Sequence, residues 1–148
     1  MIRILIAVVA TTLAACAGVQ TQSTTSSASV DANERGTIAQ IYYWRAKPGK
    51  YDEYTRYVRD IAEPIDAEAH RRGAFISLTT YMTQDTANLW THMHVFVLRD
   101  SAQLRGLTAA LDSARRRLEP DSVKRSQRVQ YLATLRDRVG AATVAILR

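Results

Sequence analysis

The sequence predicts an α+β fold in which strands and helices follow one another as β-α-β-β-α-α-β. Three observations lead to this order. Four short segments have the β-branched, aromatic or alternating composition of strands, three longer segments repeat apolar residues at helical spacing, and turn-forming residues separate them. This order is a split βαβ pattern, which predicts a four-stranded antiparallel sheet of the ferredoxin-like type.

A Pro-Gly turn separates the first strand from the first helix. Thr37 to Arg45 is β-branched and aromatic, and Lys47-Pro48-Gly49 follows it. From Lys50 apolar residues recur at helical spacing as far as Gly73, which is the residue expected after a helix end. Pro64 lies inside this segment. It should kink or split the helix because it has no N–H to bond one turn back.

A β-hairpin is predicted in the middle of the chain. Phe75 to Met82 and Leu89 to Leu98 alternate as strands do, and the polar segment from Thr83 to Asn88 joins them. Either Asp100 or Ser101 should then cap a second helix. Its apolar stripe is formed by Leu104, Leu107, Leu111, Ala114 and Leu118.

A third helix and a last strand complete the predicted order. Pro120 ends the second helix, and Asp121 can cap a third helix that runs to about Val139 and ends at Gly140. Ala141 to Leu147 is apolar enough to form a strand within the sheet.

The first residues have the pattern of an export signal. A basic start at Arg3 precedes a short apolar run, too short to span a bilayer, and small residues follow. The ending Leu13-Ala14-Ala15-Cys16 resembles the lipobox of bacterial lipoproteins. This resemblance implies that residues 1–15 are removed and that Cys16 becomes the lipidated first residue. An ordinary cleaved signal peptide and a buried first helix are the alternatives.

The resemblance also predicts a location and a domain division. In lipoproteins an Asp after the cysteine favours the inner membrane, and Ala17 stands here, so the outer membrane facing the periplasm is expected. Residues 16–35 are rich in Ser and Thr and have the composition of a flexible tether. Residues 36–148 then form one domain. It contains no cysteine, which excludes a disulfide and a thiol nucleophile.

Composition and motifs exclude several function classes. The net charge of +6 is only moderately basic, and an exported protein rarely meets nucleic acid, so no nucleic-acid partner is expected. No serine nucleophile elbow, phosphate-binding glycine loop or HExxH motif is present. The sequence therefore contains no motif of an established catalytic mechanism.

Several features combine between Ile38 and about Leu107. They are the first strand, Lys47-Pro48-Gly49-Lys50, a Tyr-rich helix with Pro64, and the hairpin before Arg99-Asp100-Ser101. As a set they resemble the dimeric α/β barrels, the superfamily of NIPSNAP-like proteins and antibiotic-biosynthesis monooxygenases. The resemblance implies a homodimer in which two sheets close face to face. The third helix is an addition to the usual pattern.

Strand alternation sorts the candidate ligand-binding residues onto one sheet face. We expect an open face lined by aromatic and imidazole groups, while Thr91, Met93, Val95 and Val97 pack under the helices. The second strand should place Ile76, Leu78, Thr80 and Met82 on the helix side. The residues assigned to the open face are Trp90, His92, His94, Phe96, Phe75, Ser77, Thr79, Tyr81, Gln40, Tyr42 and Trp44.

His92 and His94 are the best candidates for chemistry on this face. Two residues apart on a strand, they point the same way and could converge on one substrate. No third ligand is evident in the sequence, so no metal site is predicted, and packed, hydrogen-bonded histidines are the simpler interpretation.

Three functions are compatible with these residues. The first is a lipid-anchored dimeric barrel that binds a small aromatic or apolar molecule. The second is a cofactor-independent or haem-handling monooxygenase that uses Trp90, His92 and His94. The family's haem degraders carry an Asn on the first strand and a His on the second helix, and this sequence has neither. The third is a structural or stress-related protein whose barrel is filled by side chains.

A basic cluster surrounds Pro120. It consists of Arg115, Arg116, Arg117, Lys124, Arg125 and Arg128. A solvated helical surface is the ordinary interpretation of such a run, and contact with anionic lipid is the alternative for a membrane-tethered domain.

Overall fold

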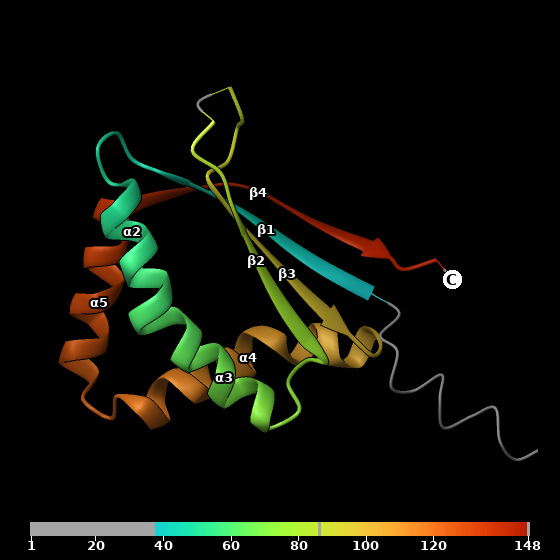
Figure 1. Ribbon diagram of the computed structural model, residues 1–148. Coiled ribbons are helices and arrows are strands. Elements are labelled where there is room, and N and C mark those ends of the chain that lie inside the picture. The colour runs from blue at the N-terminus through green and yellow to red at the C-terminus, as the bar shows by residue number, and fades with distance from the viewer. Residues whose placement is uncertain (1–37, 86, 148) are drawn as a thin grey trace, which may run out of the picture.

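The computed structural model describes residues 38–85 and 87–147 (Figure 1). The predicted signal segment, Cys16 and the tether lie outside these residues. The described chain forms four strands, β1 (Ile38–Ala46), β2 (Ser77–Met82), β3 (His92–Leu98) and β4 (Arg136–Ala145). They make one antiparallel sheet in the order β2-β3-β1-β4, which is the order that the split βαβ pattern predicts.

Helices α4 (Ser101–Leu118) and α5 (Ser122–Leu135) begin where the sequence places their caps. The Asp100 carboxylate accepts a 2.8 Å hydrogen bond from the Gln103 N–H, and Asp121 accepts bonds from the N–H groups of Val123 and Lys124. Each cap therefore satisfies donors that a helix start leaves unpaired.

The first helical segment is divided before Pro64, as predicted. It consists of α2 (Tyr51–Tyr57), a π-helical segment (Val58–Ala62) and α3 (Glu63–Arg71). Pro64 occupies the first turn of α3, where its missing N–H costs little. The wider π turn accommodates the change between the two α-helices.

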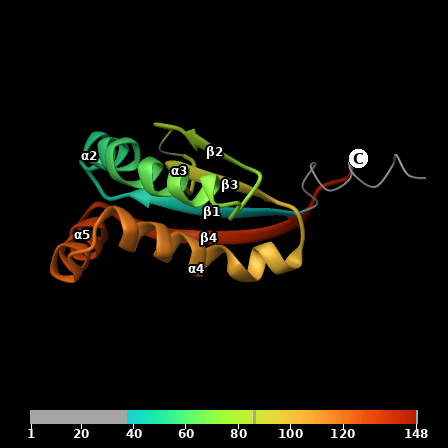
Figure 2. The ribbon, with the colours of Figure 1, turned by 90° about the horizontal axis from the view of Figure 1, so that it is seen from below.

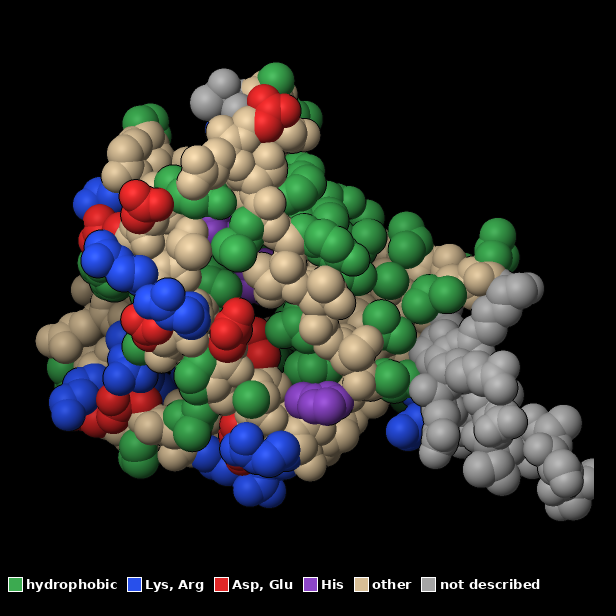
Figure 3. Space-filling view, in the orientation of Figure 1, with side chains coloured by type: hydrophobic (Ala, Val, Ile, Leu, Met, Phe, Trp, Pro, Cys, Tyr) green, Lys and Arg blue, Asp and Glu red, His purple; other side chains and the backbone are tan. Residues whose placement is uncertain are grey.

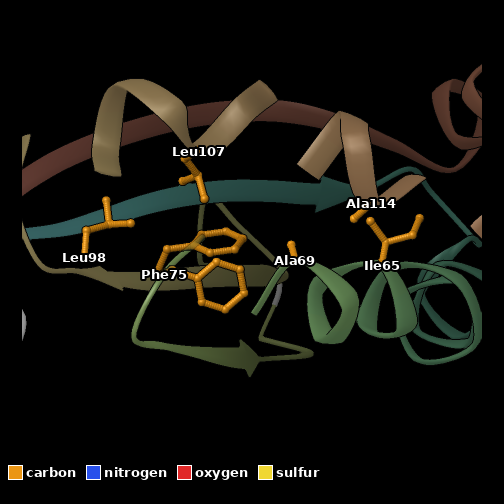
Figure 4. Close-up of a cluster of buried hydrophobic side chains, with 7 residues drawn as sticks. Ile65, Ala69, Phe75, Leu98, Leu107 and Ala114 are labelled. Carbon is orange, nitrogen blue, oxygen red and sulfur yellow. The ribbon is translucent and has the colours of Figure 1, made fainter. Parts of the chain in front are cut away.

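The helices of the described residues all pack on one side of the sheet. Seen from below, α3 and α4 lie side by side in front of the strands (Figure 2). Their inner faces meet side chains of the sheet and of the α3–β2 connection in the main core (Figure 4). The buried members of this core are Ile65, Ala69, Phe75, Phe96, Leu98, Leu107 and Ala114.

Glu68 links α3 to α4 at the edge of this core. Its carboxylate accepts hydrogen bonds of 2.7 Å from Arg72 Nε and 2.8 Å from Arg117 Nε, and it also pairs with Arg71. These three guanidinium groups lower the pKa of Glu68 to about 2. The carboxylate therefore stays charged at neutral pH and holds the helices together.

The last strand begins earlier than predicted. Residues 136 to 139, expected as the end of the third helix, belong to β4, and Gly140 lies opposite Tyr43 in the sheet instead of ending a helix. The helix stops at Leu135, whose carbonyl accepts a 2.8 Å hydrogen bond from the Lys47 N–H. Pairing with β1 outweighs the helical spacing of Val139 because it satisfies the backbone groups of an entire strand.

A β-bulge at Val139 changes the direction of the side chains along β4. Tyr43 pairs with Gly140, whereas Trp44 pairs with Arg138, so β1 has no partner for Val139. Past this extra residue the alternation reverses, and Arg138 faces the helices together with Trp44.

The other face of the sheet carries no described helix. Hydrophobic side chains gather over the strands on the side away from the helices (Figure 3). The register places on this open face the side chains of Ile41, Tyr43, Met93, Val95, Val97 and Val144.

Candidate functional site

The two histidines of β3 lie under the helices, not on the open face. His92 is 0% exposed, His94 6%, Phe96 3% and Leu98 0%. The prediction that Thr91, Met93, Val95 and Val97 pack under the helices is therefore wrong. Phe96 and Leu98 lie on the same face of β3 as the two histidines, and both side chains belong to the main core. Because these apolar side chains are buried, the histidines on the same face are buried as well.

The predicted neighbours of the histidines are only partly correct. Tyr42 pairs with His94, and Trp44 pairs with His92, so β1 contributes the expected face. On β2 the partners of His94 and His92 are Thr80 and Met82. Ser77, Thr79 and Tyr81 consequently lie on the open face, and buried Phe75 precedes β2 in the core. Trp90 lies before β3 begins.

A cavity of about 330 Å³ lies between the sheet and the helices. We call it the helix–sheet cavity. Four of the predicted candidates line it, together with residues from α4, β4 and the region around Pro64. The lining consists of Tyr42, Trp44, Ala62, Asp66, His94, Phe96, Thr108, Leu111, Asp112, Arg115, Arg136 and Arg138.

His94 lines this cavity and carries an unpartnered polar atom. Its Nε2 is buried and, within the described part of the chain, has no hydrogen-bond partner. Burial, the Arg136 charge and His92 lower the pKa of His94 to about 4. The ring is therefore neutral at pH 7, and its Nε2 can donate to or accept from a bound molecule, depending on the tautomer.

Arg136 is held in place by two aromatic residues. Its guanidinium carbon lies 3.3 Å from the centroid of the Trp44 ring, and its Nη1 donates a 2.5 Å hydrogen bond to Tyr54 Oη. Burial lowers the pKa of Arg136 and raises the pKa of Tyr54 to about 12. Both groups keep their protons at pH 7, so Arg136 adds a fixed positive charge to the cavity.

Arg138 adds a second guanidinium from the same strand. Its guanidinium carbon lies 4.9 Å from the Tyr42 ring centroid and 5.9 Å from that of Trp44. Neither Arg136 nor Arg138 forms a salt bridge with a carboxylate in residues 38–85 or 87–147. By contrast, Arg115 is paired with Asp112 at the cavity wall.

Asp66 contributes a titratable carboxyl group. Burial raises its pKa to about 7, although Arg115 and Arg136 partly oppose the shift. No hydrogen bond or salt bridge engages its side chain within the described residues. An unpaired carboxyl and an unpaired imidazole nitrogen, on two residues that line one cavity, are typical of a functional site.

His92 has a structural role by comparison. Its Nε2 lies 3.0 Å from Thr55 Oγ1 and its Nδ1 lies 2.9 Å from Thr91 Oγ1. Its ring also packs against Tyr54, with ring centroids 4.3 Å apart. Burial lowers its pKa to about 4. Both nitrogens are thus occupied, and the two imidazoles do not converge on one ligand.

The site does not fit the haem alternative. His92 has no free nitrogen, and a cavity of about 330 Å³ with two unpaired guanidinium groups on its wall is too small to enclose a porphyrin. The monooxygenase alternative also needs Trp90 beside the histidines, whereas Trp90 is absent from the cavity wall. Within residues 38–85 and 87–147 no group of three or more His, Cys, Asp or Glu could hold a metal ion.

Sequence reasoning missed the charged residues of the cavity. Arg136 and Arg138 were assigned to a helix, although their alternation with Asp137 and Val139 has the period of a strand. Asp66 was passed over, although it lies one helical turn from both Ala62 and Ala69 on the inner side of α3.

The fold has a solved counterpart of low sequence identity. HapK from Hahella chejuensis is similar in structure, with a TM-score of 0.51 and 13% identity over 74% of this chain and 92% of that chain. With the sheet order above, this similarity establishes the architecture. The domain has a ferredoxin-like fold. No known protein-family profile and no curated protein sequence matches the chain.

Half of the basic cluster of the ferredoxin-like domain is paired with carboxylates among the described residues. Arg115 pairs with Asp112, Arg117 with Glu68, and Arg128 with Glu119. Arg125 donates to the Glu119 and Pro120 carbonyls. This pairing favours the ordinary interpretation of a solvated helical surface over a lipid-binding one.

A second hollow of about 540 Å³ lies at the end of the sheet near the β1–α2 turn. Its walls include the exposed carboxylates of Asp52, Asp85 and Asp137 and the half-buried Lys47. It lacks the buried, unpartnered polar atom of the helix–sheet cavity, so we place the candidate site in the latter. Within the described residues no helix is long and apolar enough to cross a membrane.

Proposed function

We propose that this chain is a lipid-anchored periplasmic protein whose ferredoxin-like domain forms a homodimer and binds a small molecule in the helix–sheet cavity. One observation carries the binding proposal. The buried Nε2 of His94 has no partner within the described residues, and His94 lines a cavity of about 330 Å³. Leaving such an atom unpaired costs about 1–3 kcal/mol, and a bound molecule would recover that cost.

The cavity also separates this proposal from a purely structural one. A purely structural domain would fill the space between its helices and its sheet with its own side chains. The helix–sheet cavity instead leaves space beside the aromatic rings of Tyr42, Trp44 and Phe96 and several polar and charged groups. Aromatic walls with polar groups that converge on one space are typical of a ligand pocket.

The homodimer proposal rests on the open face. A sheet covered by helices on one side only leaves the other side exposed to water, and this side carries Ile41, Val95 and Val97 near its centre. A second copy related by a twofold axis would present the same apolar surface in return. Two such sheets would close into the barrel that the resemblance implies.

Filling the cavity should weaken binding. Thr108 lines the cavity on the exposed surface of α4, and Ala109 beside it is exposed and lies outside the cavity lining. Thr108→Trp is expected to weaken binding of 2-naphthamide or 2-naphthoate at least about tenfold, because the indole takes the space of the ligand. Isothermal titration calorimetry with the full chain in detergent, corrected for a detergent blank, measures the change.

Ala109→Trp is the matched control and should leave the affinity unchanged. Equal loss in both variants would point to a general effect on α4 and contradict a site in the cavity. If neither naphthalene probe binds the wild-type protein, the binding proposal fails.

The lipid anchor is tested at Cys16. In a Gram-negative host, Cys16→Ala is expected to move the full chain from the membrane fraction to the soluble fraction. The variant has no thiol to acylate, and acyl chains contribute about 0.8 kcal/mol per buried methylene. Fractionation and intact mass measure this result, with Ser23→Ala in the tether as control. A wild-type protein without the lipid mass would refute the anchor.

A further inference from the structure

We propose that the ligand of the helix–sheet cavity is a small aromatic acid, whose anionic group is bound by Arg136, Arg138 and His94. This inference rests on the proposed function, since it names the chemical class of the molecule that the cavity takes. Four features of the cavity lead to it.

The first feature is the balance of charge. Three guanidinium groups line the cavity, from Arg115, Arg136 and Arg138, and Asp112 neutralises Arg115. Arg136 and Arg138 have no carboxylate partner within the described residues. Two unpaired positive charges on one cavity wall favour an anion and disfavour a cation.

The second feature is that both guanidinium groups are pre-positioned. Arg136 lies 3.3 Å from the Trp44 ring centroid and is fixed by Tyr54, while Arg138 lies 4.9 Å from the Tyr42 ring centroid. Stacked on aromatic rings, they lose little side-chain freedom when a ligand binds. Their planar N–H groups match the geometry of a carboxylate.

The third feature is the unpartnered Nε2 of His94, which supplies a directed hydrogen bond. The neutral Nε2–H tautomer can donate this bond to a carboxylate oxygen. The fourth feature is the aromatic wall formed by Tyr42, Trp44 and Phe96, which suits a flat ring. An aromatic ring that carries one carboxylate uses all four features.

Asp66 is compatible with an anion in the same cavity. The charged and titratable groups that share its surroundings are Glu63 on α3, Asp112 and Arg115 on α4, His94 on β3, and Arg136 and Arg138 on β4. With a pKa raised to about 7, Asp66 is largely protonated below that pH and can donate a hydrogen bond. Anion affinity should therefore rise as the pH falls from about 8 to about 6.

A pair of probes tests the inference. 2-Naphthoate and 2-naphthamide have the same ring system and differ in charge. The full chain is expected to bind the carboxylate at least about tenfold more tightly than the amide, because only the carboxylate forms charge-assisted hydrogen bonds with the guanidinium groups. Isothermal titration calorimetry in detergent, with blanks, measures both affinities. Equal affinity for the two probes would overturn this inference and leave the proposed function intact, whereas binding of neither would refute both.

Two variants locate the anion contact. Arg138→Gln should reduce naphthoate affinity about tenfold and leave naphthamide affinity unchanged. Arg45→Gln is the control, because Arg45 follows Trp44 on β1 and so points to the opposite sheet face. Asp66→Asn should make naphthoate binding independent of pH between about 6 and 8. A carboxylate preference that survives Arg138→Gln unchanged would contradict the assignment.

Discussion

Replacing Val95 by Asp is expected to convert the protein from a dimer into a monomer. Val95 lies on β3 in the middle of the open face, paired with Ile41 on β1 and Thr79 on β2. In the proposed dimer this position is buried between two sheets, where a carboxylate has no partner. An unpaired buried charge costs about 2–5 kcal/mol, which raises the dimer dissociation constant at least about thirtyfold.

Sedimentation velocity at a series of protein concentrations measures this change. Ala109→Asp places the same charge on the exposed surface of α4 and should leave the dimer intact. Circular dichroism verifies that the Val95→Asp chain is folded, and Val95→Thr offers a milder variant if it is not. A wild-type protein that sediments as a monomer, or a folded Val95→Asp variant that remains a dimer, would refute the proposed interface.

Replacing Asp66 by Asn is expected to stabilise the protein at about pH 8 by roughly 2–4 kcal/mol. The pKa of Asp66 is raised from 3.8 to about 7 on folding, so the folded state binds the proton more tightly than the unfolded state. The stability from this group is present below pH 3.8 and is lost as the pH rises to about 7. Asn has no charge to bury, and the variant avoids this loss.

His92 and His94 have the opposite effect on stability. Folding lowers each pKa from 6.5 to about 4, so the unfolded state gains two protons in this window and stability falls as the pH falls. Asp66 offsets one of these protons, which leaves a net slope of about 1.4 kcal/mol per pH unit in the wild type. In Asp66→Asn the slope should be about twice as large.

Urea unfolding at several pH values, at one protein concentration, measures both effects. Asp60→Asn is the control, since Asp60 is exposed and paired only with Arg59 among the described residues. The wild type should be most stable near pH 6.5, where the histidines are neutral and Asp66 still holds its proton. No gain at about pH 8 in Asp66→Asn would show that the carboxyl is not buried as described.

Local sequence signals predicted most of the fold. The sequence offers Asp121 as the cap of the third helix and either Asp100 or Ser101 as the cap of the second, and the structure has Asp121 and Asp100 as the caps. Pro64 predicted the division of the first helix for an equally local reason. The predicted end of the third helix was wrong. Residues 136 to 139 form a strand only because they pair with β1, which is distant in sequence.

The candidate site was half predictable. Tyr42, Trp44, His94 and Phe96 were found because period-two alternation groups them on one face. Alternation does not say which face the helices cover, and Met93, Val95 and Val97 are more apolar than two histidines. The histidine side is buried nonetheless, because Leu98 and Phe96 anchor it and hydroxyl groups hydrogen-bond His92.

The bulge at Val139 links the cavity to the proposed subunit surface through one residue that β1 leaves unpaired. It reverses the alternation of β4, so that Arg138 pairs with Trp44 on the cavity side. Regular pairing of the same residues would instead place Val139 opposite Trp44 and turn both arginines outward. The positive charge would then leave the cavity and lie on the apolar surface proposed to meet the second subunit, so the bulge decides which of the two surfaces carries it.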